Sequence, residues 1–437
     1  MNLRFYGKEK NNKISSILVE SSSGEKILLD CGIQPSNMDQ SIIPRNEIKE
    51  ISGIFLTHAH LDHWGYLPYL IEGDYNNSIF MTTPTYDLLE SYAFKEYFNH
   101  LTNMSKEVYQ KVVHKIRDLI QTRKYGQLME LRDFYIHFLP ANHILGSAQI
   151  LLEEKQTKIQ ILYTGDFNPA NNFLFEPIYL KDLINKFKLD IKPKIVITES
   201  SNVNLTGSEY LKQEEIFINT INKTYQNLGN VLIPSKALGN AQEFLFRYLY
   251  YCLNKDLYMP KEIFTLGSLV EVNKVYLNHK NQFKNPKLIE LFKVNMIIKD
   301  FKAYLRKNFS NMEDLYFENK RDYGIKLFIA TGGNLKGGSS KRVFNMIKDN
   351  QQNLIITNKM LKELKCKAKI LNLDIFSLHG DFESIQKYIL DISKKNEAKI
   401  LLIHGFIQNI NKLKKFLDHQ NITNKIPKVG DLIKVGE

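Results

Sequence analysis

The chain has 437 residues, which is longer than a chain built around a single hydrophobic core usually is. We therefore expect two domains or one domain with a large insertion. Hydrophobic residues make up 43% of it and charged residues 24%, which excludes an intrinsically disordered protein. The net charge of +12 suits a polyanionic partner. A general richness in Lys, Asn and Ile explains that charge equally well, and the lysines look scattered, so charge alone identifies no partner.

The chain shows no membrane-directed segment. Its first residues lack an apolar stretch of signal-peptide length, and no segment approaches the roughly 18 apolar residues that cross a bilayer. The three cysteines, Cys31, Cys252 and Cys366, stand far apart without C-x-x-C spacing. We therefore expect a cytoplasmic protein with no membrane partner, no disulfide framework and no thiolate zinc site.

The first 200 residues predict strands and turns with helices between them. Short apolar or alternating runs, bounded by Gly, Pro, Asn or Asp, predict strands at 15–20, 25–32, 51–58, 134–140, 148–154, 158–166 and 194–200. Residues 86–123 have apolar positions spaced by three and four, which predicts helix.

Near residue 204 the pattern changes to alternating helices and strands. Helices are expected at 208–228, 241–254 and 339–349, and strands at 230–234, 262–267, 326–331 and 353–357. This alternation favours parallel pairing. Two more apolar strands, 373–380 and 398–405, are expected to close the chain. No Gly/Ser linker separates the regions, so the second region is interpreted as an inserted domain.

Three histidines and an aspartate crowd behind the strand-like run 51–57. His58, His60, Asp62 and His63 do not share one helix face, so we expect them in a loop at a strand end. Imidazole nitrogens and carboxylate oxygens bind zinc at about 2.0–2.2 Å, and four such groups within six residues can serve two metal ions. The alternative is a solvated, histidine-rich turn.

Further candidate ligands follow later strands. His143 comes after the run 134–140, and Asp166 ends the run 158–166, where a carboxylate could bridge two ions. Either residue alone would more often be structural. In series with the first cluster, both are predicted to be metal ligands.

Taken in order, these motifs resemble a known family. The H-x-H-x-D-H cluster, NHILGSA (142–148), YTGDFN (163–168) and Asp30 resemble the metallo-β-lactamase fold. VITESS (196–201), IPSKALGNAQE (233–243), ATGGNLKGGSS (330–340), SLHGD (377–381) and LLIHGF (401–406) resemble the β-CASP nuclease branch. That branch includes the nuclease subunit of the cleavage and polyadenylation factor, its archaeal and bacterial relatives, and ribonuclease J. The resemblance implies an α/β chain, a metallo-β-lactamase αββα sandwich (1–203 and 368–437) with an inserted β-CASP α/β domain (204–367).

The resemblance also implies two zinc ions, with Mn²⁺ as the alternative metal. The ligands of one ion would be His58, His60 and His143. Those of the other would be Asp62, His63 and His404. Asp166 would bridge the ions, and Asp30 would orient a ligand imidazole through a hydrogen bond.

The implied chemistry is phosphodiester hydrolysis. A zinc-bound water can have its pKa lowered to about 7, and two metals can clamp the phosphate oxygens. Besides Asp62, the catalytic set would contain His379 as general acid and Glu199, which would favour its protonated form. Ser377 and the glycines Gly332 and Gly333 are candidate phosphate contacts, although the glycines serve equally well as turn formers.

Some positions depart from the family pattern without removing a ligand. Ser200, Ser201 and Asn202 replace a Thr-Tyr-Gly sequence, Asn240 stands at a usually basic position, and Phe406 at a usually acidic one. The segment at 7–20 also lacks the usual glycine-rich start. These departures bear on substrate preference and rate.

The substrate is expected to be single-stranded RNA. His404 favours RNA, since DNA-processing relatives often carry valine there, and endonucleolytic cleavage in RNA processing or decay is the first choice. The alternatives are a 5′–3′ exoribonuclease, a DNA nuclease of the same fold and a non-catalytic RNA-binding subunit, whose known examples lose ligands that this chain keeps. The insertion and the late histidines disfavour a hydrolase of small thioesters or lactams. The expected partners are RNA and either a second copy of the chain or a processing complex.

Overall fold

The computed structural model describes all residues except 9–12, 34–42, 102–103, 171–172, 202–206, 255, 259, 261, 286–287, 289–324, 358–363, 376 and 436–437. The chain forms two compact units. The first unit comprises Met1–Asn172, Glu176–Asn204 and His379–Glu437. The second comprises Phe173–Phe175 and Leu205–Leu378. No helix in the described part is both long and apolar enough to span a membrane.

The first unit contains two seven-stranded sheets. One sheet has the order β19-β1-β2-β3-β4-β5-β6. Its strands are β1 (Asn2–Lys8), β2 (Lys13–Glu20), β3 (Lys26–Leu29), β4 (Ile51–Phe55), β5 (Ser78–Thr82), β6 (Ile120–Arg123) and β19 (Leu432–Lys434). Pairing is antiparallel from β19 to β3 and parallel from β3 to β6.

The other sheet of the first unit has the order β18-β17-β11-β10-β9-β8-β7. Its strands are β7 (Leu128–Glu130), β8 (Phe134–Pro140), β9 (Ala148–Glu154), β10 (Gln160–Tyr163), β11 (Ile195–Thr198), β17 (Lys399–Leu402) and β18 (Asn424–Lys425). Strands β10, β11 and β17 run parallel, so their carboxyl ends lie along one edge of the sheet. Strand β17 comes from the end of the chain, so the sheet joins segments on both sides of the insertion.

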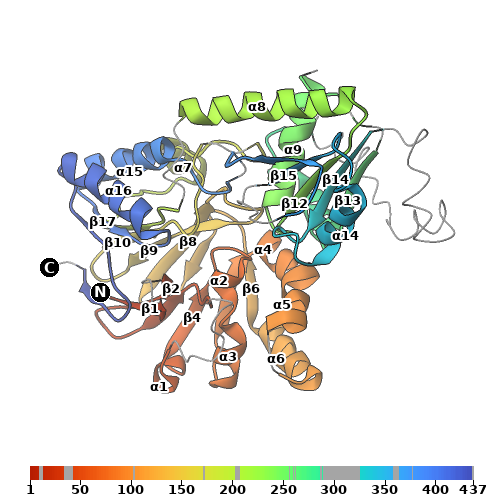
Figure 1. Ribbon diagram of the computed structural model, residues 1–437. Coiled ribbons are helices and arrows are strands. Elements are labelled where there is room, and N and C mark those ends of the chain that lie inside the picture. Colours follow the sequence, from red (N-terminus) through yellow and green to blue (C-terminus); the bar gives the residue numbers. More distant parts are fainter. Residues whose placement is uncertain are drawn as a thin grey trace. The chain divides into compact units, whose positions relative to one another are not determined.

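The two sheets pack face to face around one core. Alternate residues of β8 (Phe134, Ile136 and Phe138) are fully buried there, as expected when side chains of a strand point to opposite faces. A second apolar cluster lies between the other sheet face and the helices α7 (Leu180–Phe187), α15 (Phe382–Asn396) and α16 (Ile407–His419), seen beside β17 in Figure 1.

Helices also accompany the first sheet. They are α1 (Arg45–Ile48), α2 (Leu61–Trp64), α3 (Leu67–Glu72), α4 (Thr83–Leu88), α5 (Phe94–Leu101) and α6 (Lys106–Leu119), with a π-helical segment at Leu89–Ala93. Helices α4 and α6 contact β5. The αββα sandwich expected for this part of the chain is therefore confirmed.

The second unit is an α/β layer structure of its own. Its five-stranded sheet has the order β13-β14-β12-β15-β16, and all four pairings are parallel, as the alternating pattern predicts. The strands are β12 (Val231–Ser235), β13 (Glu262–Leu266), β14 (Lys326–Thr331), β15 (Leu354–Thr357) and β16 (Lys369–Asn372). The helices are α8 (Gly207–Gln226), α9 (Asn240–Leu253), α10 (Leu269–Asn278), a 3-10 turn at Lys280–Gln282, and α14 (Gly338–Ile347) (Figure 1).

Two predicted elements are wrong. Residues 120–123, assigned to a helix by their spacing, form β6, because they pair with β5. The run 373–380 was expected to be a strand, but its described residues form none. Leu373, Ile375 and Leu378 are apolar because this irregular segment is itself buried. The strand before it is β16, whose pairing with β15 places residues 369–372 in the second unit, so the first unit resumes at His379 rather than at 368.

Candidate metal centre

The candidate ligands of the first unit follow strand ends. Asp30 comes after β3, His58 after β4, His143 after β8, Asp166 after β10 and His404 after β17. Asp30 and His404 have positive φ angles of 55° and 47°, a conformation that non-glycine residues adopt rarely and that clusters at functional sites.

Asp62 and His63 lie elsewhere than expected. They belong to the short helix α2 rather than to a loop, although His58 and His60 do lie in the preceding loop. The Cys31 amide donates to the His63 carbonyl at 2.8 Å. A Cβ atom on Gly32 would lie 1.6 Å from the carbonyl oxygen of Asp62, so only glycine fits there. Gly32 thus allows the backbone after β3 to lie against the backbone of Asp62 and His63.

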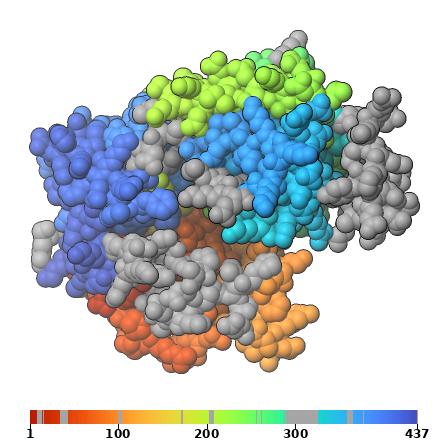
Figure 2. Space-filling view, in the orientation of Figure 1, coloured from red at the N-terminus to blue at the C-terminus, as the bar shows by residue number. Residues whose placement is uncertain are grey.

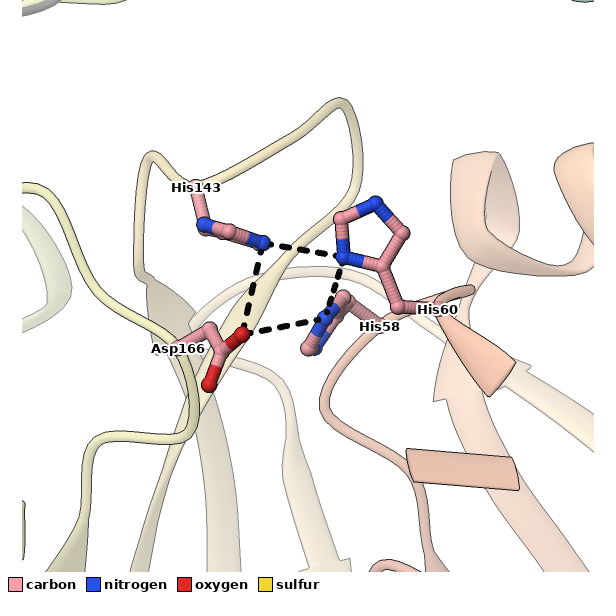
Figure 3. A group of neighbouring side chains, drawn as sticks. All are labelled: His58, His60, His143 and Asp166. Carbon is pink, nitrogen blue, oxygen red and sulfur yellow. Dashed lines mark hydrogen bonds and ion pairs between the residues drawn. The ribbon is translucent and has the colours of Figure 1, made fainter. Parts of the chain in front are cut away.

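One group of ligand atoms surrounds a common point (Figure 3). The Nδ1 atom of His60 lies 3.1 Å from His58 Nε2 and 3.0 Å from His143 Nε2. The Oδ2 atom of Asp166 lies 3.8 Å from His58 Nε2 and 3.5 Å from His143 Nε2. A tetrahedral zinc ion with ligands at about 2.05 Å needs them about 3.3 Å apart, so the four atoms have the spacing of one zinc site.

A second group uses the other oxygen of Asp166. The Oδ1 atom of Asp166 lies 3.4 Å from His63 Nε2 and 3.1 Å from His404 Nδ1. The Nε2 atom of His404 lies 3.5 Å from Asp62 Oδ2, and Asp62, His63 and His404 can converge on one ion. The carboxylate of Asp166 thus faces both groups, one oxygen to each.

Two buried atoms of this second group fit a cation. His63 Nε2 and Asp166 Oδ1 form no hydrogen bond with any described residue, which is costly for buried polar atoms. Burial raises the pKa of Asp166, but the charges of His404, His63 and His379 outweigh it and hold that pKa well below its usual range. An ionised carboxylate beside an unbonded imidazole nitrogen is the donor set that a divalent metal ion requires.

The histidines of the two groups differ in their electrostatics. Burial, reinforced by the neighbouring imidazoles, lowers the pKa of His58 well below its usual value, and burial lowers that of His143 as well. For His404, burial lowers the pKa, but Asp166 and Asp62 raise it to about 9. The carboxylates therefore draw positive charge to the second group, whereas burial favours the neutral form of His58 and His143, the form that binds metal.

Asp30 holds His63 in place. Its Oδ2 atom lies 2.7 Å from His63 Nδ1, and the Tyr163 hydroxyl and Thr57 Oγ1 donate to the same oxygen at 2.8 Å each. The Thr57 amide donates to Oδ1 at 2.7 Å. Accepting the Nδ1 proton of His63 leaves Nε2 free to bind a metal. Thr57 and Tyr163 were missed in the sequence, although Thr57 directly precedes His58 and Tyr163 begins the motif YTGDFN.

His379 and Glu199 form a pair beside the first group. His379 Nδ1 lies 2.7 Å from Glu199 Oε2, and its ring centroid is 4.6 Å from that of His143. Glu199 is buried and also accepts from the Phe167 amide at 2.5 Å. Burial lowers the pKa of His379, but the charges of Glu199 and Asp166 outweigh it and raise that pKa above its usual value. The His379 side chain keeps 24% of its surface exposed, so its Nε2 atom can meet a substrate.

Two of the departures from the family pattern, Ser200 and Ser201, contact His404, and the Ser200 amide donates to the His404 carbonyl at 2.9 Å. The Ser201 hydroxyl is 3.0 Å from His404 Nδ1, a contact that sequence reasoning missed because serine has many ordinary roles. Phe406, at the N-terminal end of α16, is 77% exposed. Asn202 lies outside the described residues, as does part of the segment at 7–20.

The three candidate phosphate contacts belong to the second unit. Gly332 has a φ of 112°, and a Cβ atom on it would lie 2.4 Å from the Gly337 carbonyl oxygen, so the turn itself requires glycine. A Cβ on Gly333 would meet nothing closer than 3.9 Å. Ser377 is partly exposed in the irregular segment before His379. Turn formation thus explains Gly332, whereas none of the described residues packs closely enough against Gly333 to require a glycine there.

Comparisons with known proteins agree with this geometry. Residues 18–197 match the family described as the metallo-beta-lactamase superfamily domain. An "RNase J-like protein" of Methanocaldococcus jannaschii is 30% identical over 431 residues, which cover 92% of each chain. A solved structure from Enterococcus faecalis V583, described as a protein of unknown function, covers 99% of each chain with a TM-score of 0.58 and 14% identity, which shows the fold alone.

Longer relatives align over the same region. The "Cleavage and polyadenylation specificity factor subunit 3-I" of Arabidopsis thaliana is 26% identical over 92% of this chain and 59% of its own length. The "Integrator complex subunit 11" of Danio rerio is 27% identical over 93% of this chain and 69% of its own length. The fold and the His/Asp cluster indicate metal binding. With a 30% identical relative covering nearly the whole chain, the chain belongs to the β-CASP nuclease branch of the metallo-β-lactamase superfamily.

Proposed function

We propose that this enzyme is a zinc-dependent ribonuclease that cleaves single-stranded RNA, internally rather than from an end. The observation that carries the proposal is the position of Asp166, whose two carboxylate oxygens face two separate groups of ligand atoms. Such a shared carboxylate is what a two-metal hydrolase needs, because two bound ions supply hydroxide at neutral pH and neutralise charge on the phosphate.

Each ion would be held by its own side chains. His58, His60 and His143 would hold one ion, and Asp62, His63 and His404 the other, with Asp166 shared. Zinc is favoured over Mn²⁺ because five of the seven candidate ligands are histidines in a tight, largely buried cluster, and imidazole nitrogen suits zinc better than manganese. Asp30 would keep His63 oriented toward its ion.

His379 would serve as the general acid, positioned by Glu199. Its Nδ1 proton is held by Glu199, so a proton on Nε2 is the one it can give to the leaving oxygen of the phosphodiester. The carboxylate also raises the pKa of His379, which favours the protonated imidazole that a general acid needs. Asp62 would contribute as a ligand on the more exposed side of the second group.

RNA is proposed as the substrate on two grounds. A relative that aligns over 92% of both chains is named for RNase J, and another is named for cleavage and polyadenylation. The chain also keeps histidine at position 404, where it contacts both carboxylates of the second group. Relatives named as subunits of larger complexes suggest that this chain too works with protein partners in RNA processing.

The test compares labelled single-stranded RNA and DNA, each incubated with the wild type, Asp62→Asn and His379→Ala. We expect cleavage of RNA by the wild type and a loss of at least about 100-fold in each variant. His114→Gln is the matched control, because His114 is 75% exposed on α6 and belongs to neither ligand group. Cleavage of DNA alone, or full activity in both site variants, would overturn the assignment.

A circular RNA separates internal from terminal cleavage. Internal cleavage linearises the circle, whereas a 5′–3′ exoribonuclease leaves it intact and degrades only the linear form of the same sequence. Binding of RNA without any cleavage, in protein with two zinc ions per chain, would instead identify a non-catalytic subunit.

A further inference from the structure

The net charge of the protein is carried almost entirely by the second unit. Residues 205–378 contain 27 Lys and Arg and 16 Asp and Glu, whereas the rest of the chain contains 32 and 31. The first unit, with the candidate metal centre, is therefore nearly neutral. Basic residues are present in both units, as a scattered distribution predicts, and in the first unit acidic residues nearly balance them.

Within the second unit the charge is concentrated further. Residues 336–369 contain nine Lys and Arg against two Asp and Glu. This stretch includes α14, β15 and the start of β16. A net charge of this size in 34 residues exceeds what a mixed, solvated surface would carry, and it attracts a polyanion.

The fold brings four of these lysines to one edge of the sheet. The amides of Lys367 and Ala368 donate to the Lys348 carbonyl at 2.7 and 2.9 Å, which joins the end of α14 to the segment before β16. β16 is the last strand of its sheet, and Lys365, Lys367 and Lys369 are all exposed there. We call Lys348, Lys365, Lys367 and Lys369 the basic edge.

The side chains of the basic edge are available to a ligand. Lys365, Lys367 and Lys369 are exposed, and none of them is in an ion pair with a carboxylate of the described chain. In Figure 2 the atoms of α14, coloured cyan, and the blue atoms of the segment near residue 370 lie at the visible surface.

We propose that the basic edge binds the phosphate backbone of the single-stranded RNA on which the enzyme acts, so this inference rests on the proposed function for the identity of the polyanion. Flexible lysines suit a strand that is held by charge rather than read by sequence. The competing explanation is that lysines on an edge strand protect it from pairing with another sheet. That role requires no affinity for RNA.

The test measures RNA binding without cleavage. A fluorescein-labelled 20-residue oligouridylate is titrated in EDTA with the wild type and with the triple variant Lys365→Gln, Lys367→Gln, Lys369→Gln, at KCl concentrations from about 50 to 200 mM. The matched control is Lys106→Gln, Lys111→Gln, Lys115→Gln, which removes the same charge from α6 of the nearly neutral first unit.

For single strands each neutralised phosphate contributes about 0.7 to the slope of log affinity against log salt, so the triple variant should lose about 2 from that slope. Its affinity near 0.1 M salt should fall on the order of tenfold or more, and the control should behave as the wild type. An unchanged slope and affinity in the triple variant would overturn the inference, and new self-association of that variant would then identify edge protection. Because cleavage is not measured, the inference can fail while the wild type still cuts RNA, and it can hold if the wild type binds RNA without cutting it.

Discussion

Replacing Asp30 by Asn should remove one metal ion without unfolding the protein. Three groups approach the Oδ2 atom of Asp30: His63 Nδ1 at 2.7 Å, Thr57 Oγ1 at 2.8 Å and the Tyr163 hydroxyl at 2.8 Å. An amide nitrogen in that place donates instead of accepting. His63 would then have to accept through Nδ1 and carry its proton on Nε2, the atom that faces Asp166 Oδ1 at 3.4 Å.

The opposite orientation of the side-chain amide introduced by Asp30→Asn is also unfavourable. It would place the amide nitrogen at the Oδ1 position, 2.7 Å from the donating amide of Thr57. Both orientations thus leave a buried donor without an acceptor. Loss of such a partner behind a metal-bound histidine typically lowers metal affinity by about 10–100-fold, or about 1.4–2.7 kcal/mol.

The assay is zinc binding by competition with a chromophoric chelator, together with metal content after dialysis. We expect Asp30→Asn to keep one ion near wild-type affinity and to lose about 10–100-fold for the other. Glu154→Gln is the matched control, because Glu154 is equally buried in the first unit and accepts from the Ser22 amide and from Thr157 Oγ1, at 2.6 and 2.5 Å. If Asp30→Asn binds both zinc ions with wild-type affinity, the conclusion that Asp30 sets the position of the His63 proton is refuted.

Three further outcomes are expected. His379→Asn should lower kcat by about 100- to 10,000-fold while zinc content, measured by atomic emission, stays at the wild-type value. Arg247→Met should destabilise the second unit by about 3–5 kcal/mol in urea denaturation, because it leaves the buried carboxylate of Glu243, 3.3 Å away, without its cation. Adding Glu243→Gln to that variant should recover much of the lost stability. Burial lowers the pKa of His137 below its usual value, so the folded state disfavours protonation of this histidine. The stability of the protein should therefore fall as the pH drops below about 6.5. His137→Gln should lessen that fall, measured by urea midpoints between pH 7.5 and 5.

The individual ligand candidates could be read from the sequence because their chemistry is local. His58, His60, Asp62 and His63 lie within six residues, and few structural roles require that composition. That His404 joins Asp166 in this cluster could not be read in this way. It depends on β10, β11 and β17 being parallel neighbours across the insertion, and long-range pairing of this kind has no signature in the strands themselves. Only the resemblance to a family supplied it.

The errors in the predicted elements have a common physical cause. Residues 120–123 continue the helical spacing of α6, but pairing with β5 stabilises them as a strand. The run 373–380 has the composition of a strand, yet it is a buried irregular segment. A short apolar run shows that its side chains will be buried, and the partner that buries them decides the backbone conformation. Thr57 and Tyr163 were missed for a related reason, because their role is defined by Asp30, a residue far from them in the chain.

The division of charge and chemistry between the two units predicts how salt should affect cleavage. The second unit carries nearly all of the net charge, whereas every candidate ligand and the pair of His379 and Glu199 belong to the first. If charge serves mainly to bind RNA, raising KCl from about 50 to 200 mM should raise KM steeply and leave kcat nearly unchanged, provided that chemistry is slower than RNA dissociation. The triple variant of the basic edge should show a higher KM at low salt and a shallower salt dependence, with the wild-type kcat. A kcat that falls with salt as steeply as RNA affinity does would contradict this division, because it would show that charge contributes to the chemical step itself.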